Sequence, residues 1–144
     1  MALARTSNVS AGRYEFKYFV PRSAAPALRE LLRQFTRPDP HAQLWPGFRY
    51  PVLTLYCDSP GLAFYEASAR GQKSRLKLRL RRYSELPHAP VYIEIKRRVG
   101  DAVVKERERA DLHAAAALTA ALRVGASESK GVHFGAVAAR FLAI

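Results

Sequence analysis

The chain has 144 residues, which is the length of one domain with a single moderate hydrophobic core. Hydrophobic residues make up 49% of it, too many for a disordered chain, and its single cysteine excludes an internal disulfide. Lys and Arg number 24 against 12 Asp and Glu, so the formal net charge is +12. An excess of this size indicates an anionic partner, such as nucleic acid, polyphosphate, a nucleotide or a membrane surface.

The N-terminal residues 1–12 contain no apolar segment of the kind found in secretory signals, and we expect them to be flexible. The most apolar stretch, Leu112–Leu122, is about half as long as a membrane span requires. The four histidines lie far apart and, with one cysteine, lack the spacing of a zinc site. The sequence therefore predicts a soluble, cytoplasmic protein.

A strand, a short helix and a connector are expected next. Arg13–Val20 alternates polar and apolar residues, which predicts a strand that ends at Pro21. Between Ser23 and Phe35, leucines at helical spacing predict an amphipathic helix. The prolines and glycine of Arg37–Pro51 predict an irregular connector.

The middle of the chain reads mostly as strands. Val52–Asp58 is rich in β-formers, and Leu62–Ala69 is long enough for two helical turns. Two further strands, Arg75–Tyr83 and Val91–Val99, are separated by a loop that contains two prolines.

A hairpin and two helices complete the predicted elements. Gly100-Asp101 suits a type II′ turn, so Val103–Arg109 is the expected returning strand. Asp111 can cap an alanine-rich helix that runs to about Leu122. The remaining residues, 125–144, form a tail of unknown role, with a flexible break at Gly125–Gly131 and a short helix at Val132–Leu142.

Most of the positive charge lies in residues 70–109, which hold 13 Lys or Arg against 5 Asp or Glu. Successive side chains alternate across a sheet, so each of the two long strands has one apolar face and one charged face. The charged face consists of Lys77, Arg79 and Arg81 in the first strand, and of Glu94, Lys96 and Arg98 together with the polar Tyr92 in the second.

The two-residue turn also fixes the pairing of the strands that flank it. In this register Lys96 faces Lys105, and Glu94 faces Arg107. Like charges directly opposed in a sheet are destabilising, so the two lysines require an anion or a carboxylate between them. Glu94 is the only carboxylate close enough in this pattern.

The charged faces allow two interpretations. They are either a solvated surface, or the inner wall of a barrel whose converging cations hold a phosphate chain. The strong bias toward Arg, whose planar fork suits phosphate oxygens, favours the second. In the barrel, Glu15 and Glu94 would hold Mg²⁺ or Mn²⁺. The alternative for each is a salt bridge to a neighbouring Lys or Arg.

Near these strands the chain contains other polar positions that have two readings. Tyr56 and Asp58 share a face with Thr54, where they either line the mouth of a cavity or serve as a buried hydroxyl and a turn carboxylate. Cys57 alternates to the apolar face and is expected in the core.

Four motifs follow one another along the chain: Arg13–Tyr18 (RYEFKY), Thr54–Ser59 (TLYCDS), Lys77–Arg81 (KLRLR) and Glu94–Arg98 (EIKRR). In this order they resemble the VTC domain of polyphosphate polymerases, which belongs to the CYTH-like triphosphate tunnel superfamily. The resemblance runs from about Arg13 to Arg109.

The resemblance implies an α+β fold in which an antiparallel β-barrel, or tunnel, has flanking helices. It implies binding of ATP or polyphosphate with a divalent metal (Mn or Mg), and transfer of a phosphoryl group from ATP to a polyphosphate chain without a protein nucleophile. By motif, the phosphate-binding positions are Lys17, Arg79, Arg81 and Lys96, and the hairpin register adds Lys105 and Arg107. Glu15 and Glu94 are the expected metal ligands.

Two departures from the family pattern affect these expectations. Arg13 replaces the first Glu of the ExExK pattern that is frequent in the superfamily, which removes one metal ligand. The family's domain also continues through further strands, whereas this sequence ends at Ile144. We therefore expect an incomplete tunnel over residues 13–124, which either forms a homodimer, is completed by another chain, or is a truncated and poorly active polymerase.

Two other functions compete with phosphoryl transfer. One is an RNA or single-stranded DNA binding module, in which Tyr83 and Tyr92 stack on bases beside the basic residues. The other is a regulatory remnant that binds polyphosphate without catalysis. The charged faces contain few aromatic residues, which favours phosphate alone as the ligand.

Overall fold

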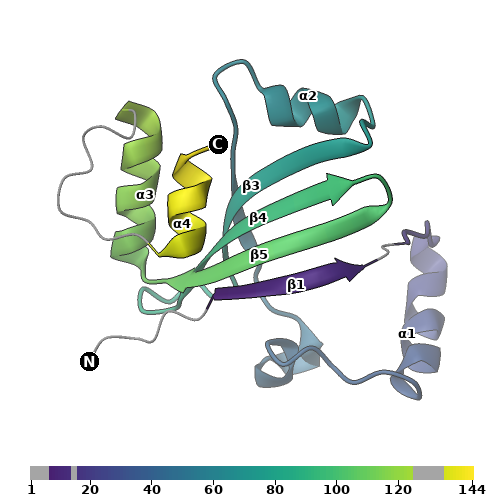
Figure 1. The fold of residues 1–144 in the computed structure, drawn as a ribbon. Helices are drawn as coiled ribbons and strands as arrows, with labels where there is room; N and C mark the ends of the chain where they lie inside the picture. Colours follow the sequence, from purple (N-terminus) through teal and green to yellow (C-terminus); the bar gives the residue numbers. More distant parts are fainter. Residues whose placement is uncertain (1–6, 14–15, 125–134) are drawn as a thin grey trace. The chain divides into compact units, whose positions relative to one another are not determined.

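The computed structural model describes residues 7–13, 16–124 and 135–144 (Figure 1). Contacts divide the chain into two compact units. One contains the first strand together with Val52–Ile144, and the other is Phe16–Pro51.

The first unit contains a five-stranded antiparallel sheet in the order β1-β5-β4-β3-β2 (Figure 1). Its strands are β1 (Ser7–Arg13), β2 (Leu53–Cys57), β3 (Ser74–Arg82), β4 (Val91–Val99) and β5 (Ala102–Ala110). The α+β class is therefore confirmed. β1 and β2 are the two edges and do not pair with each other, so the described strands form an open sheet where a closed barrel was expected.

The β4–β5 hairpin has the predicted turn and register. Gly100 has a φ of 60°, and Asp101 has a negative φ, which is the combination a type II′ turn requires. Val99 is paired with Ala102, and Lys96 with Lys105. Because the turn is local in sequence, its chemistry determined the register of both strands.

The first strand lies earlier in the chain than the alternating pattern predicted. The strand expected at Arg13–Val20 is wrong, since Phe16–Val20 has no regular structure and is exposed. β1 instead covers Ser7–Arg13, part of which was expected to be flexible. The physical reason is the length of β5: Ser7 pairs with Glu108, and Arg13 pairs with Val103, one residue from the Ala102 end of β5, so Phe16–Val20 has no β5 residue opposite it.

Three helices belong to the same unit: α2 (Ala63–Ala69), α3 (Leu112–Val124) and α4 (Ala136–Leu142). Asp111 caps α3 as predicted, since its Oδ1 accepts a hydrogen bond of 2.7 Å from the Ala114 amide. Asp58 accepts bonds of 2.9 and 2.8 Å from the Phe64 and Tyr65 amides. Asp58 is therefore a turn carboxylate at the start of α2. The predicted break at residues 125–131 lies outside the described residues.

The hydrophobic core lies between the sheet and α3 and α4, which cover one of its faces (Figure 1). The buried side chains of this core are Leu78, Leu80, Val91, Ile93, Ile95, Ala115, Leu118, Val137, Ala138 and Phe141. Cys57 packs against this cluster, as expected. The leucines and isoleucines predicted on one face thus form the core, and the charged positions between them lie on the opposite face.

Glu108 is a buried carboxylate on the helix-covered face. Its Oε2 accepts hydrogen bonds of 2.9 and 3.3 Å from the amides of Val137 and Ala138. These two amides are in the first turn of α4, where backbone donors have no partner within the helix. Glu108 therefore fixes the start of α4 on β5.

The second unit contains short helical elements. The predicted amphipathic helix is α1 (Ala25–Arg33), preceded by the 3₁₀ turn η1 (Arg22–Ala24). Two further 3₁₀ turns, η2 (Ala42–Leu44) and η3 (Pro46–Phe48), lie in the proline-rich connector. In the residues that the structure describes, no helix is long and apolar enough to cross a membrane.

Candidate anion-binding site

The face of the sheet opposite α3 and α4 carries a dense set of cations, which we call the basic face. Alternation along the strands and the observed register place its members on one surface. They are Arg75, Lys77, Arg79 and Arg81 of β3, Lys96 and Arg98 of β4, and Lys105, Arg107 and Arg109 of β5.

Three lysines form a row across the middle of the basic face. Lys77 is directly opposite Lys96, and Lys96 is directly opposite Lys105, on three adjacent strands. Adjacent strands lie about 4.8 Å apart, so the row brings three ammonium-bearing side chains together on one line. Like charges in such positions repel each other unless an anion or a carboxylate lies among them.

Glu94 is the carboxylate at the centre of the basic face, and its side chain is 0% exposed. Its Oε2 accepts a hydrogen bond of 2.6 Å from the Nε of Arg79. Its Oε1 lies 2.8 Å from the Nζ of Lys105 and 3.0 Å from the Nε of Arg107. The predicted role of Glu94 as the carboxylate beside Lys105 is therefore confirmed.

The protonation of Glu94 is controlled by these cations. Burial by itself would raise its pKa, but the contacts with Lys105 and Arg79 outweigh this effect and lower the pKa below the ordinary value of a glutamate. Glu94 is therefore ionised at neutral pH. One negative charge is shared among three positive ones, which leaves this cluster with a net positive charge.

Tyrosine side chains hold the two arginines of this cluster. Arg107 Nη2 donates a hydrogen bond of 2.6 Å to the hydroxyl of Tyr83, and its Cζ lies 3.9 Å from the ring centroid of Tyr92. Tyr56 is directly opposite Arg79 and forms a hydrogen bond with it, which lowers the pKa of the Tyr56 hydroxyl against the opposing effect of burial. The charges of Lys77 and Arg81 lower this pKa further. The basic face therefore contains aromatic residues at both sides of Glu94.

Five of the six predicted phosphate-binding residues lie on the basic face: Arg79, Arg81, Lys96, Lys105 and Arg107. Arg81 Nε donates a bond of 3.2 Å to the Thr54 hydroxyl. Lys17 belongs to the Phe16–Pro51 unit, where it is exposed, so its place in the site stays a prediction. Glu15 lies outside the described residues.

The described residues do not fit a divalent metal. Over residues 7–13, 16–124 and 135–144 no group of three His, Cys, Asp or Glu side chains could hold an ion. Both oxygens of Glu94 already contact cations, and a metal there would add positive charge to a cluster that has an excess of it. A metal held with Glu15 stays a prediction.

Sequence reasoning gave no role to Tyr56 or Tyr83 as partners of the arginines. The signal for Tyr56 was absent because β2 and β3 are joined by α2, so their register is not set by a short turn. Lys77 was on the predicted charged face but was not among the predicted site residues. Its position in the lysine row follows from the register of β3 with β4.

Tyr83, which directly follows β3, and Tyr92 of β4 are arranged differently from a base-stacking platform. Tyr83 and Tyr92 are half-buried and pack edge to face, with ring centroids 5.5 Å apart and planes at 61°. Arg107 lies against both rings. Because their faces contact protein groups, these rings favour positioning of Arg107 over stacking on nucleotide bases.

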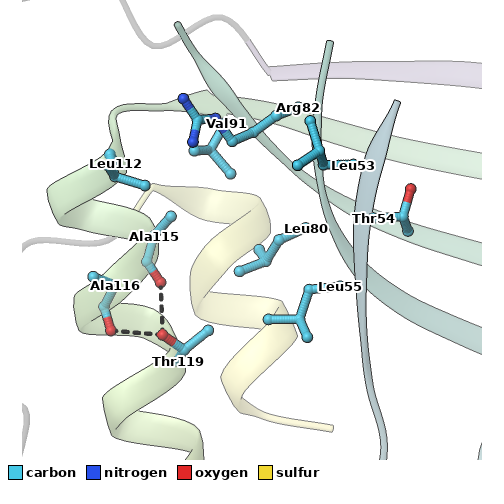
Figure 2. A pocket seen from close by; sticks show the side chains of 10 residues that line it. All are labelled: Leu53, Thr54, Leu55, Leu80, Arg82, Val91, Leu112, Ala115, Ala116 and Thr119. Atoms are coloured by element: carbon cyan, nitrogen blue, oxygen red, sulfur yellow. Dashed lines mark hydrogen bonds between the residues drawn. The ribbon is translucent and has the colours of Figure 1, made fainter. Parts of the chain in front are cut away.

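An apolar pocket of about 410 Å³ lies on the helix-covered side, between β2 and α3 (Figure 2). Leucines and alanines line most of it, and its Thr119 hydroxyl donates to the backbone oxygens of Ala115 and Ala116 in its own helix. The lining of this pocket is therefore mostly apolar, and Arg82 is its charged residue.

The fold and the basic face together define an α+β protein whose antiparallel sheet carries a cationic surface. Residues 12–133 match the family model of the VTC domain, and the chain therefore belongs to the VTC domain family. Searches of curated proteins and of solved structures gave no match. Membership of this family is consistent with a polyphosphate-related function.

Proposed function

We propose that this protein binds polyphosphate or a nucleoside triphosphate on the basic face and supports phosphoryl transfer from ATP to a polyphosphate chain. The observation that carries the proposal is the row of Lys77, Lys96 and Lys105 beside the Glu94 cluster. The row places three positively charged side chains along one line. A chain of phosphates supplies several negative charges along one line and is therefore complementary to it.

Such a site acts by positioning the reacting phosphates and by neutralising their negative charge. A terminal phosphate oxygen of the polyphosphate attacks the γ-phosphorus of ATP, the bond from that phosphorus to the β,γ-bridging oxygen breaks, and ADP leaves. No side chain has to form a covalent bond. The arginines and lysines of the basic face would hold the reacting phosphates in line and stabilise the charge that develops on their oxygens.

The described sheet forms one wall of the proposed site. β1 and β2 are unpaired on their outer sides, so further strands from a second copy or another chain can extend the sheet there. Completion of a tunnel in this way is part of the proposal, and the divalent metal implied by the family resemblance would enter with the added residues.

Thermal stabilisation by tripolyphosphate tests the proposal directly. A ligand that binds the folded state raises the midpoint of unfolding as its concentration increases. We expect a rise with tripolyphosphate and a smaller one with an oligonucleotide of matched charge. A rise with the oligonucleotide alone would overturn the proposal and assign the basic face to nucleic acid.

A further inference from the structure

Glu94 lies in the middle of the basic face, in contact with the residues proposed to bind phosphate. Among the described strand positions on this face, Glu94 is the only acidic residue. It contacts three cations from two different strands. A carboxylate in a phosphate site reduces the attraction for the ligand, so its presence there needs a physical reason.

The reason lies in how the two arginines are held. Arg79 contacts Glu94 through Nε and shares a hydrogen bond with Tyr56. Arg107 contacts Glu94 through Nε and donates from Nη2 to Tyr83. Each guanidinium is thus held at two points and still has N–H groups left, because a guanidinium carries five.

Held side chains lose less conformational freedom when a ligand binds. Ordering a long, flexible side chain costs free energy at the moment of binding, and a site whose side chains are ordered beforehand avoids that cost. Without the buried carboxylate, Arg79, Lys105 and Arg107 would repel one another and move apart.

We infer that Glu94 is the positioning residue of the anion site: it holds Arg79, Lys105 and Arg107 in a phosphate-binding arrangement and does not serve as a metal ligand. This inference rests on the proposed function. If net charge alone decided affinity, removing a carboxylate would strengthen the binding of an anion. If Glu94 positions the cations, removing it weakens the binding.

The test is the affinity of the full chain for tripolyphosphate, measured by titration calorimetry in the presence of EDTA. We expect E94Q to bind about tenfold more weakly than the wild type, the scale of loss typical of misplaced binding groups. The matched control is E106Q, which removes a carboxylate from the same strand pair but from the other face, where Glu106 contacts Arg140. E106Q should keep the wild-type affinity.

The outcomes separate this inference from the proposed function. If the wild type fails to bind tripolyphosphate, the proposed function fails. If the wild type binds and folded E94Q binds equally well or more tightly in EDTA, the positioning role is wrong. A loss in E94Q that appears only when Mn²⁺ or Mg²⁺ is added would also overturn it, in favour of a metal ligand.

Two further variants keep the inference testable if E94Q does not fold. E94D keeps the negative charge. If E94Q folds, E94D should bind tripolyphosphate more tightly than E94Q does. If E94Q is unfolded, E94D should fold and bind with an affinity within about tenfold of the wild type. Y83F removes the hydrogen bond from Arg107 to the Tyr83 hydroxyl without changing any charge. It should weaken the binding of tripolyphosphate about threefold. Wild-type affinity in folded Y83F together with no binding by folded E94D would overturn the inference.

Discussion

Glu94 stays ionised in a fully buried position because three cations surround it. Its pKa is lowered in the folded protein, so folding favours its charged form. A group of this kind contributes stability that is fully present above its unfolded pKa, which is about 4.3 for a glutamate. That contribution is lost as the pH falls through the lower, folded pKa.

We therefore expect the free energy of unfolding of the wild type to fall steeply as the pH is lowered from about 5 toward 3. E94Q lacks the titrating group and should show a smaller fall over the same range. Urea unfolding of both proteins at several pH values measures the difference. Parallel losses of stability in the two proteins would show that Glu94 contributes nothing to the acid sensitivity.

Arg79 and Arg81 are neighbours on the basic face, and changing both removes two guanidinium groups from the proposed phosphate site. We expect R79Q/R81Q to lose thermal stabilisation by tripolyphosphate, since each charge-assisted contact contributes about 1.5–3 kcal/mol. R22Q/R33Q, which removes the same charge from the other unit, should keep it. Equal losses in both double variants would mean that the attraction depends on net charge and has no specific site.

At the scale of elements, the start of α4 depends on close contact with β5. A Cβ built on Gly135 would lie 1.9 Å from Oε1 of Glu108, the carboxylate that binds the first amides of α4. G135A should therefore displace Glu108 and lower the free energy of unfolding by about 1–3 kcal/mol. Urea unfolding measures this loss.

Gly61 provides the control for this substitution. A Cβ there would have no atom within 4 Å, and Gly61 has an ordinary backbone conformation. G61A should leave stability within about 0.5 kcal/mol of the wild type. A similar loss in both variants would show that the packing of α4 on Glu108 is unimportant.

Local sequence signals predicted the elements well where the interactions that decide them are local. The Gly100 turn predicted which residues of β4 and β5 pair, and Asp111 predicted the start of α3. The alternation of Arg13–Val20 failed because a strand requires a partner, and Arg13 already pairs with Val103, one residue from the Ala102 end of β5. The pairing of Tyr56 with Arg79 depends on two strands separated by a helix, and no short-range pattern encodes it.

At the scale of the whole molecule, the open sheet leaves two strand edges and nearby apolar surface. Leu53 and Leu55 on the edge strand β2 are 41% and 54% exposed and line the apolar pocket. Unpaired strand edges with apolar side chains favour association with another chain. A homodimer is one of the alternatives expected from the sequence, and it stays a prediction.

We expect the average mass measured by sedimentation equilibrium to exceed the 16.1 kDa of one chain and to rise with concentration. L55K places a charge on the edge strand and should shift the population toward the single chain, because charged edges oppose strand pairing. V99K, a change of an exposed valine at the hairpin, should leave the mass unchanged. A constant mass of one chain for the wild type would contradict self-association.

The row of Lys77, Lys96 and Lys105 has a consequence for the thermodynamics of the site. In a buffered solution such a row attracts small monovalent anions, which must leave before a polyanion can occupy their places. When a polyanion binds, several small anions are released for each polyanion bound. The favourable free energy of binding then comes largely from the translational entropy of the released anions. Orthophosphate and simple salts become competitors, and the ionic composition around the protein sets how long a phosphate chain must be to displace them.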